Sequence, residues 1–86
     1  MSTETEKFRE LLDQSYQWPD YYDFKFIIKI EEKHHLLEKL KGFTVTEKPS
    51  KNGNYVAITA RKLINNTQEV IETYEVVSTV KGIMSL

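Results

Sequence analysis

Residues 43–63, FTVTEKPSKNGNYVAITARKL, contain two segments in which apolar and polar side chains alternate, joined by a polar connector. Alternation with a period of two predicts β-strands, because successive side chains of a strand point to opposite faces of its sheet. The two segments therefore predict a β-hairpin, whose apolar face must pack on the rest of the chain. The connector is built from residue types that favour chain reversal: Pro49, Ser50, Asn52, Gly53 and Asn54.

The most regular alternation lies upstream, from Tyr22 to Ile30. Its odd-numbered side chains are mostly charged, which predicts a strand with one buried face and one face in water. The even-numbered side chains, all apolar, are expected to form the buried face: Tyr22, Phe24, Phe26, Ile28 and Ile30.

Two further segments have the apolar periodicity of helices that cover a sheet. Residues 31–41 carry acidic residues first and basic residues last, and Gly42 follows as a C-cap. Residues 66–78 open with Asn66 and Glu69 at capping-box spacing. The tail, residues 80–86, alternates around Gly82, which favours a last strand.

The N-terminal residues predict an additional element before this core. Phe8, Leu11 and Leu12 give a short amphipathic helix over residues 4–14, with an apolar stripe too small to be stable alone. Proline disfavours helical geometry at Trp18, so residues 15–20 are expected to form an extended lead-in whose indole covers one end of the core.

The predicted order of the remaining elements is β-α-β-β-α-β. The compact fold that has this order is the α+β ferredoxin-like fold. We expect a four-stranded antiparallel sheet of order 4-1-3-2 with both helices on one face and a short extra N-terminal helix. The whole chain, residues 1–86, is expected to be one domain, with residues 1–17 as helix and lead-in and residues 18–86 as the ferredoxin-like core. The helix-free face would then expose Lys25, Ile27, Lys29, Tyr55, Ala57, Thr59 and Arg61.

The composition limits the class of protein. Eighty-six residues suffice for one small core with shallow sites, and the formal net charge of -1 gives no excess of positive charge to attract nucleic acid or anionic lipid. Without cysteine there is no disulfide, thiol nucleophile or thiolate metal site, which fits a reducing compartment. The polar N-terminus and short apolar runs predict neither an export signal nor a membrane span, so we expect a cytoplasmic protein without membrane contact.

Several stretches resemble the YbeD-like family of small bacterial proteins. Residues 48–55, Lys-Pro-Ser-Lys-Asn-Gly-Asn-Tyr, are similar to the family's hairpin signature, and residues 18–25 are similar to its aromatic-proline lead-in and first strand. The chain departs at Asn52, where the family often has lysine, and in a shorter first helix. The resemblance implies a ferredoxin-like fold akin to the ACT regulatory domains, a bacterial cytoplasm, no established biochemical activity, and a suggested link to regulation, including that of lipoate metabolism.

Residues with catalytic or metal-binding chemistry do not form a recognisable site in the sequence. His34 and His35 point about 100° apart on a helix, and no cysteine or third histidine completes a metal shell. Glu31 and Glu32 lie on or beside a predicted exposed helix face and are best interpreted as solvated charges. We therefore expect neither an enzyme nor a bound metal or cofactor.

A regulatory or protein-interaction module is the favoured function, with a protein or small-molecule effector as partner and a monomer or weak homodimer as its state. An amino-acid effector site of the ACT type is not supported, because the turn Ile30–Lys33 lacks glycine. For the hairpin connector, a role in folding alone is as well supported as a role in binding. The candidate interaction surface is the connector: Lys48, Pro49, Ser50, Lys51, Gly53, Asn54 and Tyr55.

The alternative function is weak nucleic-acid binding on the helix-free face, because RNA-recognition domains share this fold. Residues 51–58 match their third-strand motif at Lys51, Tyr55 and Val56, but Gly53 stands where the first stacking aromatic belongs. A solvated sheet face explains the same charges, so nucleic acid is not the favoured partner. The residues of this alternative patch are Lys25, Lys29, Tyr55 and Arg61.

Overall fold

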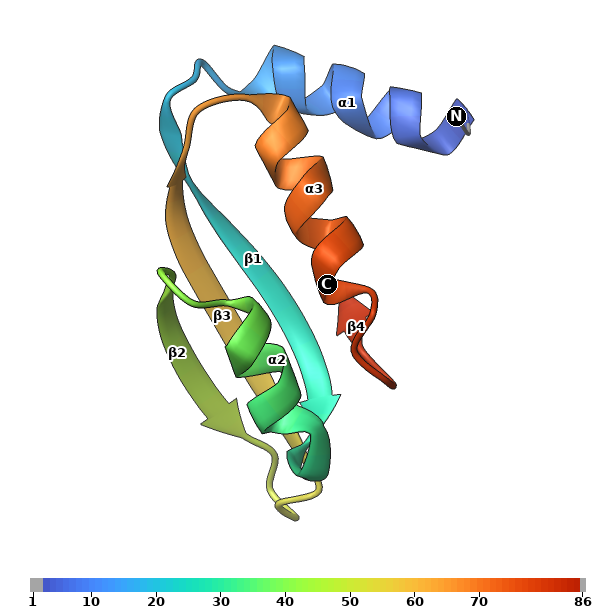
Figure 1. The fold of residues 1–86 in the computed structure, drawn as a ribbon, viewed down its shortest axis with the longest axis vertical. Coiled ribbons are helices and arrows are strands. Elements are labelled where there is room, and N and C mark those ends of the chain that lie inside the picture. The colour runs from blue at the N-terminus through green and yellow to red at the C-terminus, as the bar shows by residue number, and fades with distance from the viewer. Residues whose placement is uncertain (1–2, 86) are drawn as a thin grey trace.

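A computed structural model describes residues 3–85 of the chain as an α+β fold with three α-helices and a four-stranded antiparallel sheet (Figure 1). The elements in chain order are helix α1 (Thr3–Ser15), strand β1 (Asp20–Lys29), 3-10 helix η1 (Ile30–Glu32), helix α2 (Lys33–Lys39), strands β2 (Thr44–Pro49) and β3 (Tyr55–Ile64), helix α3 (Thr67–Val77) and strand β4 (Met84–Ser85). No helix within residues 3–85 is long and apolar enough to cross a membrane.

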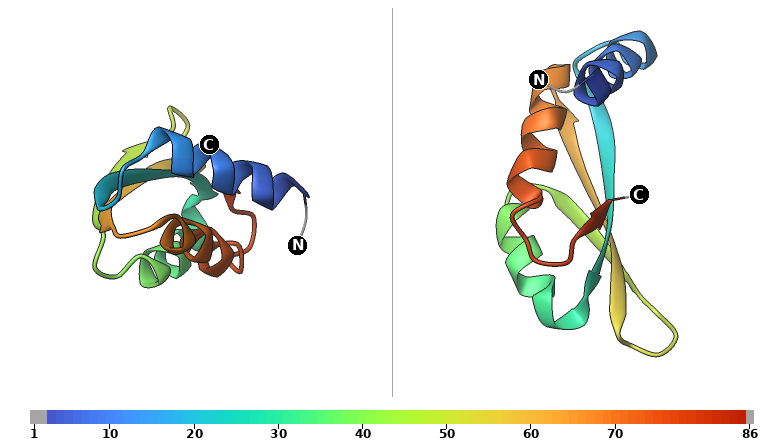
Figure 2. Two further views of the ribbon diagram at one scale, coloured as in Figure 1. Left: turned by 90° about the horizontal axis from the view of Figure 1, so that it is seen from above. Right: turned by 90° about the vertical axis from the view of Figure 1, so that its right-hand side faces the viewer.

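The strand order across the sheet is β2-β3-β1-β4, which is the predicted order 4-1-3-2 read from the other edge. The two longest strands, β1 and β3, are central and pair along their whole length, from Asp20 opposite Ile64 to Lys29 opposite Tyr55. Both α2 and α3 lie on the same face of the sheet, as predicted, and leave the other face without helices (Figure 2).

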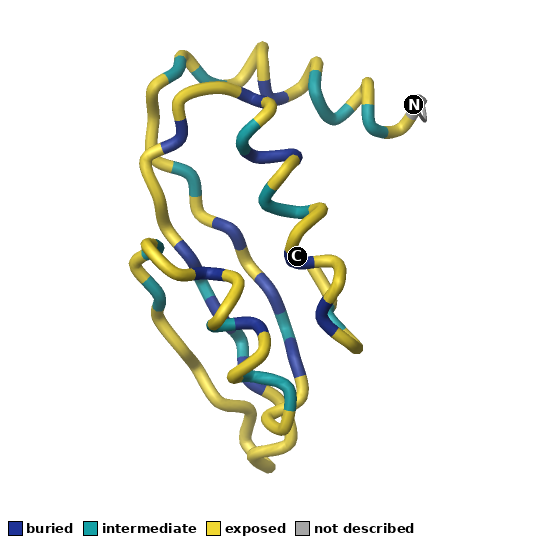
Figure 3. The backbone as a smooth tube through the Cα atoms, in the orientation of Figure 1, coloured by how far each residue is buried: buried dark blue, intermediate teal, exposed yellow. Residues whose placement is uncertain are grey.

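The core lies between the sheet and these two helices. Burial alternates along β1, where Phe24, Phe26 and Ile28 have no exposed surface, as the sequence predicts (Figure 3). On β3, Val56, Ile58, Ala60 and Ile64 face the same core, and α2, α3 and the turn after α3 complete it with Leu36, Leu40, Val70, Val77 and Val80.

Helix α1 covers the end of the core at which β1 begins. Leu12 is buried with 5% of its surface exposed, and the ring of Phe8 lies 5.8 Å from that of Tyr74 on α3. The lead-in is held by Trp18, which stacks on Tyr16 at a centroid distance of 4.9 Å. The indole packs against the core, as the sequence predicts, and α1 is an integral part of the packed domain.

The hairpin connector is stabilised by hydrogen bonds to the backbone and the side chain of Ser50. The backbone N–H of Ser50 donates to the carbonyl oxygen of Tyr55 (2.9 Å), and the N–H of Tyr55 donates back to Ser50 Oγ (3.1 Å). Gly53 has a φ of 74°, in the left-handed region that favours glycine. The expected chain reversal is confirmed, although Pro49 is the last residue of β2 and not part of the turn.

The structure corrects two predicted helix boundaries and one predicted face. The helix expected over residues 31–41 begins as the 3-10 turn η1 and is α-helical only from Lys33 to Lys39. Ile30 belongs to that turn and is 40% exposed, so the buried face of β1 ends at Ile28. The reason is geometric, since a 3-10 turn at residue 30 rotates the chain out of the sheet.

The tail expected to be a strand over residues 80–86 is a strand only at Met84–Ser85. Val80 lies in a turn, where its N–H donates to the carbonyl oxygen of Val77 (3.0 Å) and its side chain enters the core. Gly82 has a φ of 75°, so extended geometry begins only after it. Leu86, the last residue of the predicted strand, lies outside the described residues.

Candidate functional site

The face of the sheet without helices, here called the open face, carries the two surfaces that the sequence singled out. Strand alternation places the odd-numbered side chains of β1 and β3 on this face, and the register sets the even-numbered side chains of β2 beside them. Its members on the two central strands are Tyr21, Asp23, Lys25, Ile27, Lys29, Tyr55, Ala57, Thr59, Arg61 and Leu63.

At the hairpin end of the open face lies a mostly apolar depression of about 440 Å³, here called the hairpin groove. The four strands of the sheet and the connector contribute to it, so side chains far apart in the sequence meet there. The residues that line the hairpin groove are Ile27, Lys48, Pro49, Ser50, Tyr55, Ala57 and Met84.

The sheet register explains why a depression forms at this place. Ala57 on β3 lies opposite Ile27 on one side and opposite Lys48 on the other. Because alanine has only a methyl group, the larger side chains of its neighbours stand above it on both sides. Met84 pairs with Ile27 from the far side and extends the apolar wall, while Tyr55 closes the hairpin end.

Four of the seven predicted contact residues line the hairpin groove: Lys48, Pro49, Ser50 and Tyr55. The other three, Lys51, Gly53 and Asn54, form the turn beyond it. Asn54 lines a separate, smaller depression of about 290 Å³ together with Tyr55, Lys29 and Glu31. The structure thus divides the predicted surface into a groove wall and a turn that holds the wall in position.

Sequence reasoning did not assign three of the lining residues, Ile27, Ala57 and Met84, to a site. Ile27 had a local signal, because it is the only apolar side chain between Asp23 and Lys29 at the odd-numbered positions of β1. Met84 had no such signal, since its place beside Ile27 depends on the pairing of β1 with β4.

The alternative patch is not one cluster. Lys29 and Tyr55 lie opposite each other, but Arg61 lies six positions after Tyr55 on β3, about 20 Å along the strand. Arg61 is engaged at its own end of the face, where Nη1 lies 3.3 Å from Asp23 Oδ1 and the guanidinium carbon lies 4.7 Å from the centroid of the Tyr21 ring. Lys25 lies between the two ends, opposite Thr59.

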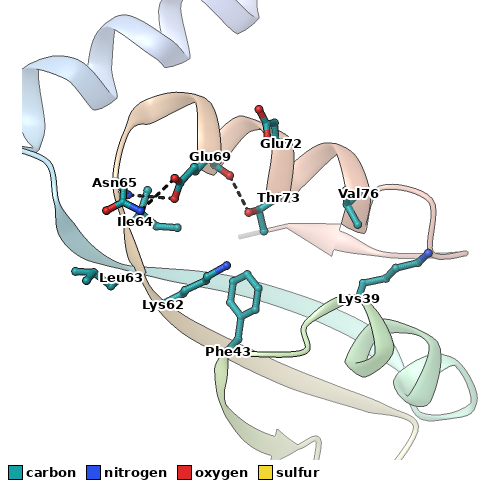
Figure 4. A pocket seen from close by; sticks show the side chains of 10 residues that line it. All are labelled: Lys39, Phe43, Lys62, Leu63, Ile64, Asn65, Glu69, Glu72, Thr73 and Val76. Carbon is teal, nitrogen blue, oxygen red and sulfur yellow. Dashed lines mark hydrogen bonds between the residues drawn. The ribbon is translucent and has the colours of Figure 1, made fainter.

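A second depression, of about 380 Å³, lies on the helix side between α2, β3 and α3 (Figure 4). Its charged lining residues are Lys39, Lys62, Glu69 and Glu72, and the ammonium of Lys62 lies 5.0 Å from the ring centroid of Phe43. The carboxylate of Glu69 accepts hydrogen bonds from Asn65, from the backbone N–H (3.1 Å) and from Nδ2 (3.3 Å). Glu69 therefore caps the start of α3. It differs from the predicted capping box in that its carboxylate binds the N–H of Asn65.

The histidines are exposed on α2, as the sequence predicts. Nδ1 of His35 lies 2.7 Å from Glu32 Oε2, and this hydrogen bond lowers the pKa of the Glu32 carboxyl below its usual value. Within residues 3–85 no group of three or more histidine, cysteine, aspartate or glutamate side chains is placed to hold a metal ion. At the hairpin groove the lining itself supplies mostly apolar contact, with Lys48 as its charged residue.

Comparison of the chain with known protein families, with curated proteins and with solved structures yields no match.

Proposed function

We propose that this chain is a ferredoxin-like domain of the YbeD-like family that acts, without catalysis, as a protein-interaction module in the bacterial cytoplasm. The observation that carries the proposal is the hairpin groove, an apolar depression on a sheet face that no helix covers. Its walls include four residues of the segment that carries the family resemblance, Lys48, Pro49, Ser50 and Tyr55. Exposed apolar depressions rimmed by polar groups are typical of contact sites between proteins.

The chemistry of the groove indicates what its partner presents. The floor and one wall, made by Ala57, Ile27 and Met84, suit one large apolar side chain, and burying such a side chain contributes about 1.5–3 kcal/mol. Lys48 lines the rim, and Lys29 lies beside Tyr55 at the same end of the sheet. A partner with an apolar anchor flanked by acidic residues would therefore complement both the floor and the rim.

The experiment is affinity capture from an extract of the native cells, followed by titration of the purified captured protein into this one. We expect Tyr55→Ala and Lys48→Ala each to weaken binding while the protein stays folded by circular dichroism. Matched controls are Tyr21→Ala, which truncates an exposed tyrosine at the far end of the open face, and Lys41→Ala, which removes an exposed lysine after α2. Equal affinity of all four variants and the wild type would reject the hairpin groove as the contact surface.

The second candidate function, weak nucleic-acid binding, is favoured by one observation: Lys25, Lys29 and Arg61 share the open face with Tyr55. It predicts an increase in the anisotropy of labelled single-stranded RNA or DNA at low ionic strength, with a steep dependence on salt. The double variant Lys25→Ala with Arg61→Ala would abolish that binding. An unchanged anisotropy for the wild type would eliminate this function.

A further inference from the structure

Part of the outer edge of β1 carries backbone groups that pair with no other strand in residues 3–85. The N–H of Ile30 donates to the carbonyl oxygen of Asn54 (3.0 Å), one step beyond the pair Lys29 and Tyr55. Antiparallel ladders alternate between hydrogen-bonded and non-hydrogen-bonded pairs, so the even-numbered residues of β1 direct their backbone groups toward β3. The N–H and C=O groups of Tyr21, Asp23 and Lys25 consequently point toward the opposite edge.

Among the described residues, strand β4 pairs with β1 at Phe26 and Ile27 only. Within residues 3–85 no strand pairs with Asp20–Phe24 on this side. The N–H of Tyr21 is capped by Asp20 Oδ1 (2.8 Å). In Figure 1, α1 crosses above this upper half of β1 and β4 lies lower down. We call the segment from Tyr21 to Phe24 the free edge.

A second observation, independent of the backbone, lies beside the free edge on the helix side. A depression of about 440 Å³, here called the α1–α3 groove, has Phe8, Ile71 and Tyr74 as its apolar lining. Tyr74 lies over β1, since its hydroxyl is 3.4 Å from that of Tyr22 and its ring is 5.3 Å from that of Phe24. An added strand would therefore point alternate side chains toward this groove.

The charge at the groove indicates the kind of strand that fits. Glu4 and Glu75, both exposed, lie at the lining of the α1–α3 groove. They favour basic side chains on the same face of the incoming strand as its apolar side chains. A second copy of β1, paired antiparallel with the first, fits less well. If the pairing is centred on Asp23, the two aspartates lie opposite each other and repel. If it is centred on Phe24, it needs Phe26, which already pairs with Ser85.

We propose that the free edge of β1 binds an extended segment of a partner protein as an added β-strand, whose apolar and basic side chains enter the α1–α3 groove. The main chain of β1 supplies the hydrogen bonds and the groove supplies the selection among sequences. This surface is separate from the hairpin groove, so it stands or falls independently of the function proposed above.

The probe is a labelled peptide, acetyl-Lys-Thr-Val-Thr-Val-Thr-Lys-amide, titrated against the full chain at low ionic strength. Its valines and lysines fall on the groove side, and its threonines fall on the open-face side. The odd-numbered residues of β1 direct their N–H groups to this edge and their side chains to the open face. In an antiparallel pair, directly opposite residues share a face, so these residues pair with the threonines, whose N–H groups therefore face β1. N-methylation of two threonines is expected to weaken binding about tenfold or more, because two backbone hydrogen bonds are lost. N-methylation of the two valines is expected to leave binding within about twofold.

Variants of the protein test the same surface from the other side. Asp23→Pro removes an outward N–H without touching the ladder to β3 and is expected to weaken binding about tenfold. Asp23→Asn keeps that N–H, and Glu47→Pro removes the corresponding group at the β2 edge, so both are expected to bind as the wild type does. Glu75→Lys should weaken binding of the lysine peptide and restore it for a peptide with glutamates in place of the lysines.

Four results would overturn the proposal. They are no saturable binding, equal binding of the two methylated peptides, equal effects of Asp23→Pro and Glu47→Pro, and a homodimer in sedimentation that Asp23→Pro dissociates. The variants are first checked for a native circular dichroism spectrum. If Asp23→Pro does not fold, the methylated peptides decide the matter with the wild-type protein alone.

Discussion

The indole Nε1 of Trp18 donates a 2.9 Å hydrogen bond to Oγ1 of Thr67, 49 residues away at the start of α3. The Thr67 hydroxyl in turn donates to Asp13 Oδ1 on α1. One threonine therefore links α1, the lead-in to β1 and α3, and it is buried with 5% of its surface exposed. These contacts explain why the N-terminal helix, too weak to be stable alone, is held in a defined place.

Replacing Thr67 by valine, which has nearly the same shape, removes both hydrogen bonds and leaves the indole N–H without its partner. We expect a loss of about 1–3 kcal/mol in the free energy of unfolding, measured by urea denaturation. Thr79→Val is the matched control, because the Thr79 hydroxyl is exposed and bonds only to the carbonyl oxygen of Val76. A loss at Thr67 no greater than at Thr79 would contradict the bridging role.

The packing of α1 on the core is tested by two adjacent leucines of opposite burial. Leu12 is 5% exposed and Leu11 is 60% exposed. Leu12→Ala removes buried methyl groups and leaves a cavity, so it is expected to lower the free energy of unfolding by about 2–4 kcal/mol. Leu11→Ala is expected to change it by less than about 0.5 kcal/mol. Similar urea midpoints for the two variants would show that α1 does not pack on the domain in solution.

The hairpin turn depends on the backbone conformation of Gly53 and not on space. Its φ of 74° is left-handed, yet an added Cβ would have nothing within 4 Å. Gly53→Ala is therefore expected to destabilise the fold by about 1–2 kcal/mol through conformational strain alone. Gly53→Asn should cost less, since asparagine tolerates this region better. Thermal melting of the two variants against the wild type makes the comparison, and an alanine variant as stable as the wild type would contradict it.

Tyr74 predicts how stability changes at high pH. Its burial, with a smaller effect from the hydrogen bond with Tyr22, raises the pKa of the phenol well above the usual tyrosine value of about 10. The folded state therefore holds this proton more tightly than the unfolded chain does. That contribution to stability is fully present below pH about 10 and is lost as the pH rises further.

The measurement is the melting temperature between pH about 8 and 11.5, a range that crosses the usual tyrosine pKa. Tyr74→Phe keeps the ring contacts and removes the proton, so its melting temperature is expected to fall less steeply above pH about 10 than that of the wild type. Tyr21→Phe, at an exposed position, should follow the wild type. Parallel curves for wild type and Tyr74→Phe would refute the role of the buried phenol.

Much of the fold could be predicted from local patterns. The alternation at Phe24, Phe26 and Ile28 predicted a strand and its buried face, and Asn66 predicted the start of α3, where its side chain accepts a hydrogen bond from the N–H of Glu69 (3.0 Å). The boundaries that were wrong lie at turns. At Ile30 the pattern continues but the chain leaves the sheet, and side-chain periodicity carries no information about where a backbone turns.

Side-chain periodicity is a local property of the chain, so the sequence by itself determined the central strands and the covering helices and the side of each that faces the core, except at Ile30 and in residues 80–83. Contacts between distant segments depend on register and on where the strands end, and only the tertiary structure decided them. Pairing of Met84 with Ile27 extends the apolar wall of the hairpin groove, and within residues 3–85 the short β4 leaves the Tyr21–Phe24 edge of β1 without a partner strand. The hairpin groove and the free edge both depend on which strands pair and in which register. Backbone hydrogen bonds between strands set that register, and the spacing of residues in the sequence does not reveal it.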